Sequence, residues 1–179
     1  MFYAALIAGL AGLDLAFKYL IEKQEPGEFP RPLRHTKERI WLYRNHNSGF
    51  PFGFLKEYGQ VVRTVPLIII SGLGGILCYL LPKKGAAAEK WGISLILGGA
   101  LSNLYDRYVR RFVVDYVNVR AGALKQVVFN LGDLFVFVGT LFLALLSLAR
   151  DLRSQWASMR QFIKKSRKNP LKSLYRPGQ

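Results

Sequence analysis

Two aspartates lie where apolar segments meet polar ones: Asp115 in the stretch FVVDYV, and Asp133 in NLGD, directly before a long apolar run. Burial of a carboxyl group among apolar side chains favours its protonated form. Two carboxyl groups a few ångströms apart do not both ionise readily, so one keeps a proton while the other is charged. The charged group can take a proton from water, and the protonated one can polarise a peptide carbonyl. This is the chemistry of aspartyl proteases, and Asp115 and Asp133, each at a helix end on one side of a membrane, are the candidate pair.

The same residue types also serve a second chemistry. Ion pathways in transporters use carboxylates within the membrane. The spacing of Asp115 and Asp133 by itself supports a peptidase and a small proton-coupled transporter equally, and both remain open at this point.

The elements that position these aspartates are apolar blocks separated by charged stretches. The chain has 179 residues, of which 51% are hydrophobic, yet its net charge is +15. A helix needs roughly 20 apolar residues to cross a bilayer core of about 30 Å. The blocks that approach this length are Phe2 to Ile21, Val65 to Leu81, Trp91 to Tyr105, and Leu134 to Ala149. We predict an all-α membrane protein with four transmembrane helices in residues 1–150, of which the third is the least apolar.

Alternatives to this fold are disfavoured by the pattern. A soluble helical bundle would show a polar face on each helix, and VPLIIISGLGGILCYLL shows none. The only cysteine, Cys78, lies inside this stretch, so we expect no disulfide within the chain and a buried thiol. Lys and Arg are equally frequent in the loops on the two sides of the predicted spans, so the positive-inside rule does not decide orientation. Their density in the C-terminal tail favours both termini in the cytoplasm.

The loop at about residues 22–62 is predicted to form a small extracytoplasmic subdomain of strand and loop. The residues Ile40 to Tyr43 suit a strand, and NSG suits a turn. The apolar FPFGFL that follows is expected to lie in the membrane interface. Its two histidines, His35 and His46, lack the spacing of metal ligands, so neither a metal nor another cofactor is expected.

Further polar residues interrupt the predicted spans and need partners, because a charge at the centre of a bilayer is unfavourable by about 2.5–3.5 kcal/mol. Asp14 and Lys18 are four residues apart on one helical face, which predicts a structural ion pair. Asp106 is expected to be a structural partner of nearby basic groups. The small residues Ser94, Gly98 and Ser102 recur every four residues, which predicts close approach of a neighbouring helix.

Two amides accompany the carboxylates. Asn103 precedes Asp106 by three residues, and Asn130 precedes Asp133 by three, so each amide lies beside a carboxylate. Arg107 can clamp a carboxylate or a peptide carbonyl with two hydrogen bonds.

The tail at residues 151–179 is basic and partly amphipathic. Its apolar residues at helical spacing are Leu152, Trp156, Met159 and Ile163. A basic amphipathic helix favours anionic lipid headgroups. Nucleic-acid binding is not expected, because the tail directly follows a membrane span. The last residues, NPLKSLYRPGQ, are expected to be disordered.

Four segments, in order, resemble the motifs of one known family. They are DLAFK (Asp14 to Lys18), NSGFPFGFL (Asn47 to Leu55), GGALSNLYDRYVRRFVVDYV, and FNLGD. Together they are similar to those of the bacterial lipoprotein signal peptidases, also called signal peptidase II.

This resemblance implies a four-helix aspartyl endopeptidase of the bacterial inner (cytoplasmic) membrane. Such enzymes remove the signal peptide from prolipoproteins, cutting before a cysteine that bears a diacylglyceryl group. It implies a site facing the outer leaflet, both termini in the cytoplasm, and inhibition by the peptide-like antibiotic globomycin. The catalytic residues would be Asp115 and Asp133. The residues that line the substrate site would be Asn47, Gly49, Asn103, Arg107 and Asn130.

The chain also departs from the family pattern at several positions. Leu15 replaces the usual Gln, Phe50-Pro51 the usual Ala-Ala, Gly132 the usual Ala, and Tyr116 the usual Phe. None of these removes a catalytic group. A non-catalytic relative that only binds lipoprotein precursors would lack one aspartate of the pair, whereas this chain has both.

Overall fold

The computed structural model describes residues 1–49 and 54–168 of the chain, with side chains described as far as Lys165. The chain divides into two compact units, Met1–Leu141 and Phe142–Gln179, and the first contains every predicted site residue. The residues of the predicted interfacial segment at 50–53, and the predicted disordered end at 169–179, lie outside the described part.

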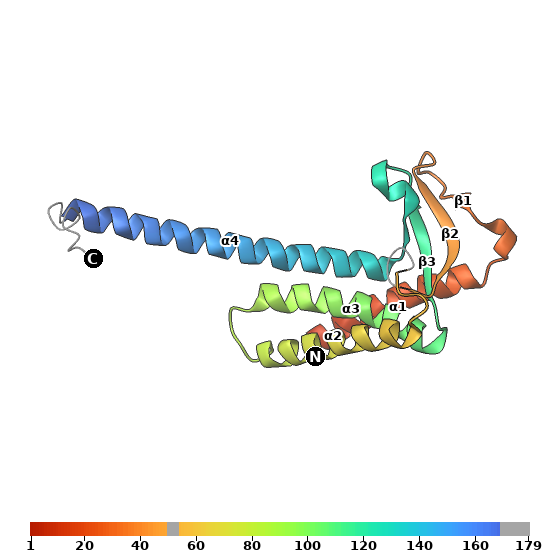
Figure 1. The fold of residues 1–179 in the computed structure, drawn as a ribbon, viewed down its shortest axis with the longest axis horizontal. Helices are drawn as coiled ribbons and strands as arrows, with labels where there is room; N and C mark the ends of the chain where they lie inside the picture. The colour runs from red at the N-terminus through yellow and green to blue at the C-terminus, as the bar shows by residue number, and fades with distance from the viewer. Residues whose placement is uncertain (50–53, 169–179) are drawn as a thin grey trace. The chain divides into compact units, whose positions relative to one another are not determined.

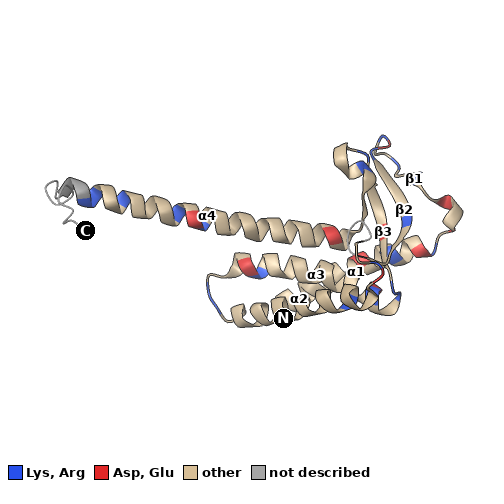
Figure 2. Cartoon of the chain, viewed as in Figure 1, with Lys and Arg blue, Asp and Glu red and all other residues tan. Residues whose placement is uncertain are grey.

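Four long helices are present: α1 (Phe2–Glu22), α2 (Gly59–Leu80), α3 (Ala87–Val109) and α4 (Leu131–Lys168) (Figure 1). Within the first unit, α3 packs against both α1 and α2. Figure 2 shows that Lys, Arg, Asp and Glu are sparse along α1, α2 and α3, whereas α4 carries several of them from its middle onward. The helices cover the four predicted apolar blocks, apart from Leu81. Helices α1 and α3 extend beyond their blocks by at most four residues at either end, α2 begins six residues earlier than its block, and α4 continues 19 residues past Ala149.

Three of the described helices are long and apolar enough to cross a membrane: α1, α2, and α4 over Leu131–Lys165. Helix α3 is of similar length, but its composition is more polar, so the fourth span stays a prediction. Its small residues pack as predicted, since Ser94, Gly98 and Ser102 are all buried. A Cβ atom added to Gly98 would lie 2.7 Å from the Cβ of Leu10 in α1.

A four-stranded antiparallel sheet stands at the end of the helices where α1 and α3 end (Figure 1). Its order is β1 (Arg31–Pro32), β2 (Ile40–Asn47), β3 (Val113–Val119) and β4 (Val128–Phe129). The strand predicted at Ile40 to Tyr43 is confirmed and continues to Asn47. A register shift lies between Leu42 and Asn45, after which Asn45 pairs with Asp115.

Strand β3 corrects one expectation, because Asp115 lies in the middle of a strand and not at a helix end. Side chains alternate between the faces of a strand. Val114 and Tyr116 therefore share one face, where they form the buried core with Ile21 of α1. Asp115 lies on the opposite face.

Two features of the helices complete the fold. Helix α4 continues without interruption past Arg150, and its tail residues Leu152, Trp156 and Met159 are exposed. The side chain of Cys78 is also exposed, so the expectation of a buried thiol is wrong. Hydropathy places a residue in an apolar helix but does not say which face of the helix it occupies.

Candidate active site

Asp115 is held from two sides by amide side chains. Its Oδ1 accepts a hydrogen bond from Asn130 Nδ2 at 2.8 Å, and its Oδ2 accepts one from Asn47 Nδ2 at 3.2 Å. The backbone N–H of Gly49 donates to Asn47 Oδ1 at 3.1 Å. This local turn occupies the amide oxygen of Asn47, so that its Nδ2 faces Asp115. The NSG motif thus directs the amide N–H group of Asn47 toward the carboxylate of Asp115.

Asp133 is positioned by the start of α4. Asn130 precedes the helix as its N-cap residue, and its Oδ1 accepts a hydrogen bond from the N–H of Asp133 at 2.8 Å. In return, Asp133 Oδ2 accepts from the N–H of Asn130 at 3.3 Å. This is the reciprocal arrangement of a capping box. The three-residue spacing of FNLGD therefore closes the helix end and fixes the carboxylate at the same time.

One residue, Asn130, joins the two aspartates. It is completely buried, donates to Asp115 through its side chain, and exchanges two hydrogen bonds with Asp133. The two carboxyl groups also interact electrostatically. The pKa of Asp115 is raised to about 7, chiefly by burial and also by the negative charge of Asp133, against the hydrogen bonds from Asn130 and Asn47. Asp115 therefore exchanges its proton near neutral pH.

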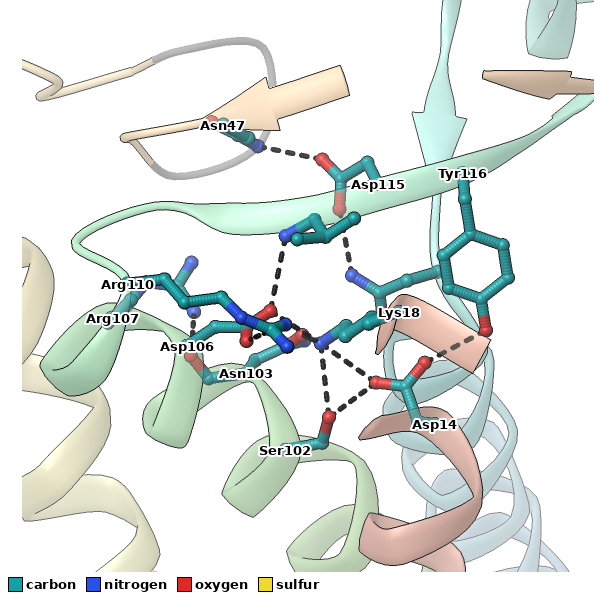
Figure 3. A network of polar contacts seen from close by, with 12 residues as sticks. Asp14, Lys18, Asn47, Ser102, Asn103, Asp106, Arg107, Arg110, Asp115 and Tyr116 are labelled. Carbon is teal, nitrogen blue, oxygen red and sulfur yellow. Dashed lines mark hydrogen bonds and ion pairs between the residues drawn. The ribbon is translucent and has the colours of Figure 1, made fainter. Parts of the chain in front are cut away.

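Figure 3 shows a buried charge cluster centred on Lys18, below Asp115 in this view. Its ammonium group lies 2.8 Å from Asp14 Oδ2 and 3.1 Å from Asp106 Oδ2, and all three side chains are completely buried. It also donates to Ser102 Oγ at 3.0 Å. Tyr116 donates to Asp14 Oδ1 at 3.0 Å from β3. The ion pair expected between Asp14 and Lys18 is present and ties α1 to α3 and to the sheet.

Asn103 links this cluster to Asp133. Its Oδ1 accepts a hydrogen bond from Lys18 Nζ at 2.8 Å, and its Nδ2 donates to Asp133 Oδ1 at 2.8 Å. An ammonium group can only donate. Lys18 therefore fixes the orientation of the Asn103 amide, so that the Nδ2 group of Asn103 faces the carboxylate of Asp133.

Arg107 and Asp106 connect α3 to the sheet. Arg107 Nη2 donates to the carbonyl of Gly49 at 3.3 Å, in the turn that positions Asn47. The basic partners predicted for Asp106 are present: besides Lys18, its Oδ1 accepts from Arg110 at 2.7 Å. Its Oδ2 also accepts from the N–H of Val114 in β3. Arg107 thus contacts the turn that positions Asn47, and Asp106 contacts the strand that carries Asp115.

The structure thus gathers all the predicted site residues in one region. The amides Asn47, Asn103 and Asn130 each contact an aspartate, while Gly49 and Arg107 contact one another. Tyr116 was missed as a structural contact: besides its bond to Asp14, its hydroxyl accepts from the N–H of Leu131 at 3.2 Å. Its position opposite Asp115 depends on strand β3, which the continuous run VVDYV does not signal.

A cavity of about 370 Å³ opens beside Asp115. It is formed by the end of β2, by Lys56, and by residues 126–128 before and in β4. Within residues 1–49 and 54–168, no three His, Cys, Asp or Glu side chains are grouped as a metal site would require. A buried pair of carboxyl groups beside an open polar cavity can activate a water molecule against a bound amide.

Comparison with known proteins places this fold among bacterial membrane enzymes. Two solved structures, both described as a bacterial membrane enzyme, share 22% identity with the chain. One covers 84% of this chain and 88% of its own with a TM-score of 0.69, and the other covers 82% and 92% with a TM-score of 0.67.

Sequence relatives carry a more specific name. A lipoprotein signal peptidase of Mesorhizobium japonicum is 31% identical over 137 residues, which cover 76% of this chain and 79% of the relative. One of Aeromonas hydrophila is 36% identical over 136 residues, which cover 74% of this chain and 80% of the relative. The sequence model of the family described as signal peptidase (SPase) II matches residues 6–149. The chain therefore belongs to the signal peptidase II family and is a peptidase.

Proposed function

We propose that the chain removes the signal peptide from diacylglyceryl-modified prolipoproteins, cutting before the lipidated cysteine, by aspartyl-protease chemistry. Family membership and the names of the relatives support the reaction. One observation carries the catalytic assignment. Asp115 from β3 and Asp133 from α4 are held by the same buried residue, Asn130, beside an open cavity.

The surroundings of the two aspartates support different roles for them. Asp133 lies in the first turn of α4, where the helix dipole stabilises a negative charge, and it accepts hydrogen bonds from Asn103 and from the Asn130 backbone. Asp115 lies in a strand, and burial raises its pKa to about 7, so it keeps a proton at neutral pH for part of the time. We assign Asp133 as the base and Asp115 as the acid.

The reaction then proceeds in two steps. As a water oxygen bonds to the scissile carbonyl carbon, Asp133 takes one of its protons and Asp115 gives its own proton to the carbonyl oxygen. The resulting diol collapses when its C–N bond breaks, and the amine nitrogen receives the proton held by Asp133. A hydroxyl proton returns to Asp115. The pair thus ends with one proton, as it began.

The remaining polar residues serve the substrate backbone in this proposal. Asn47, Asn103 and Asn130 orient the two carboxylates and offer amide groups at the site. Arg107 holds the turn at Gly49 and faces the same region. Lys18 and Asp14 act behind them as a structural ion pair.

The proposal includes a membrane topology with four spans. Helix α3 has 23 residues, which at 1.5 Å each gives about 34 Å, enough for a fourth span. Its buried polar residues include Ser102 and Asp106, which both contact Lys18 of α1, and such partners allow a polar helix in lipid. Four spans place both termini on one side. We propose that this side is the cytoplasm and that the sheet and the site lie at the outer leaflet of the inner membrane.

Two further partners complete the proposal. The tail at 151–179 is proposed to form a cytoplasmic element distinct from the peptidase domain of residues 1–150. Its exposed residues include basic Arg153, Arg160, Lys164 and Lys165, which suit anionic lipid headgroups. Globomycin is proposed as an inhibitor at the aspartate pair.

The experiment that tests the function is cleavage of a diacylglyceryl-modified prolipoprotein by the purified chain, with and without globomycin. We expect a single cut before the modified cysteine, and its suppression by the inhibitor. Mass spectrometry of the products identifies the bond. Proton-dependent uptake into vesicles without any cleavage would contradict the proposal and favour a transporter.

A further inference from the structure

The mechanism above does not say which part of the substrate occupies the cavity beside Asp115. Its walls include the side chains of Asn45, His46 and Ser48 from the end of β2, together with Lys56 and Gln126. We propose that this cavity is the subsite for the first residues after the lipidated cysteine, and that Lys56 makes it prefer an acidic residue there over a basic one. The inference rests on the proposed function and adds a specificity-determining residue to it.

The position of the cavity decides which part of the substrate enters it. The helical side of the aspartate pair is occupied by α1 and α3, which contribute Lys18 and Asn103 to the polar network. A signal peptide is an apolar segment and approaches from the membrane. The cavity is instead formed by the sheet and its connecting segments, and none of its lining residues belongs to a helix that could span a membrane. Substrate residues beyond the scissile bond therefore leave Asp115 toward the cavity.

The lining chemistry suits a polar peptide. The side chains of Asn45, Ser48 and Gln126 can donate to and accept from a peptide backbone. His46 is engaged elsewhere, since its Nε2 lies 2.9 Å from Glu22 Oε1 and its ring stacks on Phe112. The cavity thus offers hydrogen bonds on several sides, beside an apolar wall at Val127 and Val128.

Lys56 supplies the positive charge of the cavity. It is exposed, and it forms no ion pair with any carboxylate in the described part of the chain. The residues outside that part contain no Asp or Glu that could act as its partner. The other fixed charge of the lining is Asp115, which exchanges a proton in the reaction. An acidic substrate side chain would provide the missing partner of Lys56, and a basic one would be repelled.

The size of the preference follows from the exposure of Lys56. Ion pairs open to solvent are weak, so the expected preference is roughly two- to fivefold in kcat/KM. The test uses the full chain in lipid nanodiscs and two diacylglyceryl-modified prolipoproteins that differ only in carrying Asp or Lys at the two positions after the cysteine.

Three variants report on the assignment. Lys56→Gln should bring the ratio of kcat/KM for the two substrates close to one, and Lys56→Glu should invert it. Lys37→Glu is the matched control, since it makes the same change in net charge. Lys37 precedes β2, whereas the cavity lies at the other end of this strand, which is roughly 23 Å long. It should keep the preference of the unmodified chain.

The outcomes separate the two proposals. If both substrates are cut and Lys56→Glu leaves their ratio unchanged, the subsite assignment is overturned while the proposed function stands. An equal shift of the ratio by Lys37→Glu would likewise overturn it, because the effect would then come from net charge. If the unmodified chain cuts neither substrate, the proposed function fails, and the subsite with it.

Discussion

Replacing Asp115 by Asn should stabilise the protein more at high pH than at low pH. The pKa of this carboxyl group is raised from 3.8 to about 7, chiefly by burial. The folded protein therefore holds a proton that the unfolded chain releases as the pH rises from about 4 to about 7, and its stability falls over this window. At about 1.36 kcal/mol per pKa unit, the full effect is roughly 4 kcal/mol, complete above pH 7.

Asparagine carries no charge, so the variant lacks this pH dependence. Between pH 5 and pH 8 its stability relative to the unmodified protein should rise by about 3 kcal/mol. A constant offset from the altered hydrogen bonds to Asn47 and Asn130 does not affect this difference. Thermal unfolding in detergent at both pH values measures it. Asp151→Asn, at an exposed position of α4, makes the same charge change and is the control.

Equal shifts of the unfolding midpoint at pH 5 and pH 8 for Asp115→Asn would refute the reasoning. They would mean that the carboxyl group of Asp115 titrates alike in the folded and unfolded chain. The assigned acid would then lack the environment that keeps its proton near neutral pH.

Three other predictions follow from the same structure. Asp115 is assigned as the proton donor and its pKa is raised to about 7, so kcat/KM for prolipoprotein cleavage should decrease above that pH, approaching a tenfold decrease per pH unit. A kcat/KM that stays unchanged up to about pH 9 would contradict this. Tyr116→Phe removes a buried hydrogen bond to Asp14 and should lower stability by about 1–3 kcal/mol in thermal unfolding while leaving cleavage in place; lost turnover in a stably folded variant would count against a purely structural role. Gly98→Ala places a Cβ 2.7 Å from that of Leu10 and should destabilise the α1–α3 contact by about 1–3 kcal/mol, which an unchanged unfolding midpoint would disprove.

The helices were predictable because charge and apolar residues are segregated along the chain. The same segregation made the interruptions visible, so that Asp14, Lys18 and Asp133 stood out against apolar surroundings. The three-residue spacing of Asn130 and Asp133 was enough to place the amide beside the carboxylate, since a capping box is a local structure.

Strand β3 was not predictable from the same signals. Residues of VVDYV are buried on both faces of the sheet. A strand buried on both faces reads as a continuous apolar run, which periodicity does not distinguish from the end of a helix. The position of Asp115 opposite Tyr116 therefore emerged only with the sheet.

The links between distant elements were also beyond the sequence. Asn103 was expected beside Asp106 on one helical face, yet it bridges Lys18 of α1 and Asp133 of α4. Such a contact depends on how helices pack, because its partners are far apart along the chain. The cavity at Lys56 arises in the same way, from the end of β2 meeting residues 126–128.

The most direct test of the central claim compares the unmodified chain with Asp115→Asn and Asp133→Asn in cleaving a diacylglyceryl-modified prolipoprotein. Folding of each variant is verified by its thermal unfolding midpoint. We predict a cut before the modified cysteine by the unmodified chain and a loss of at least about 10²-fold in kcat for each folded variant. Full activity in either variant would contradict the assignment of Asp115 and Asp133 as the catalytic pair.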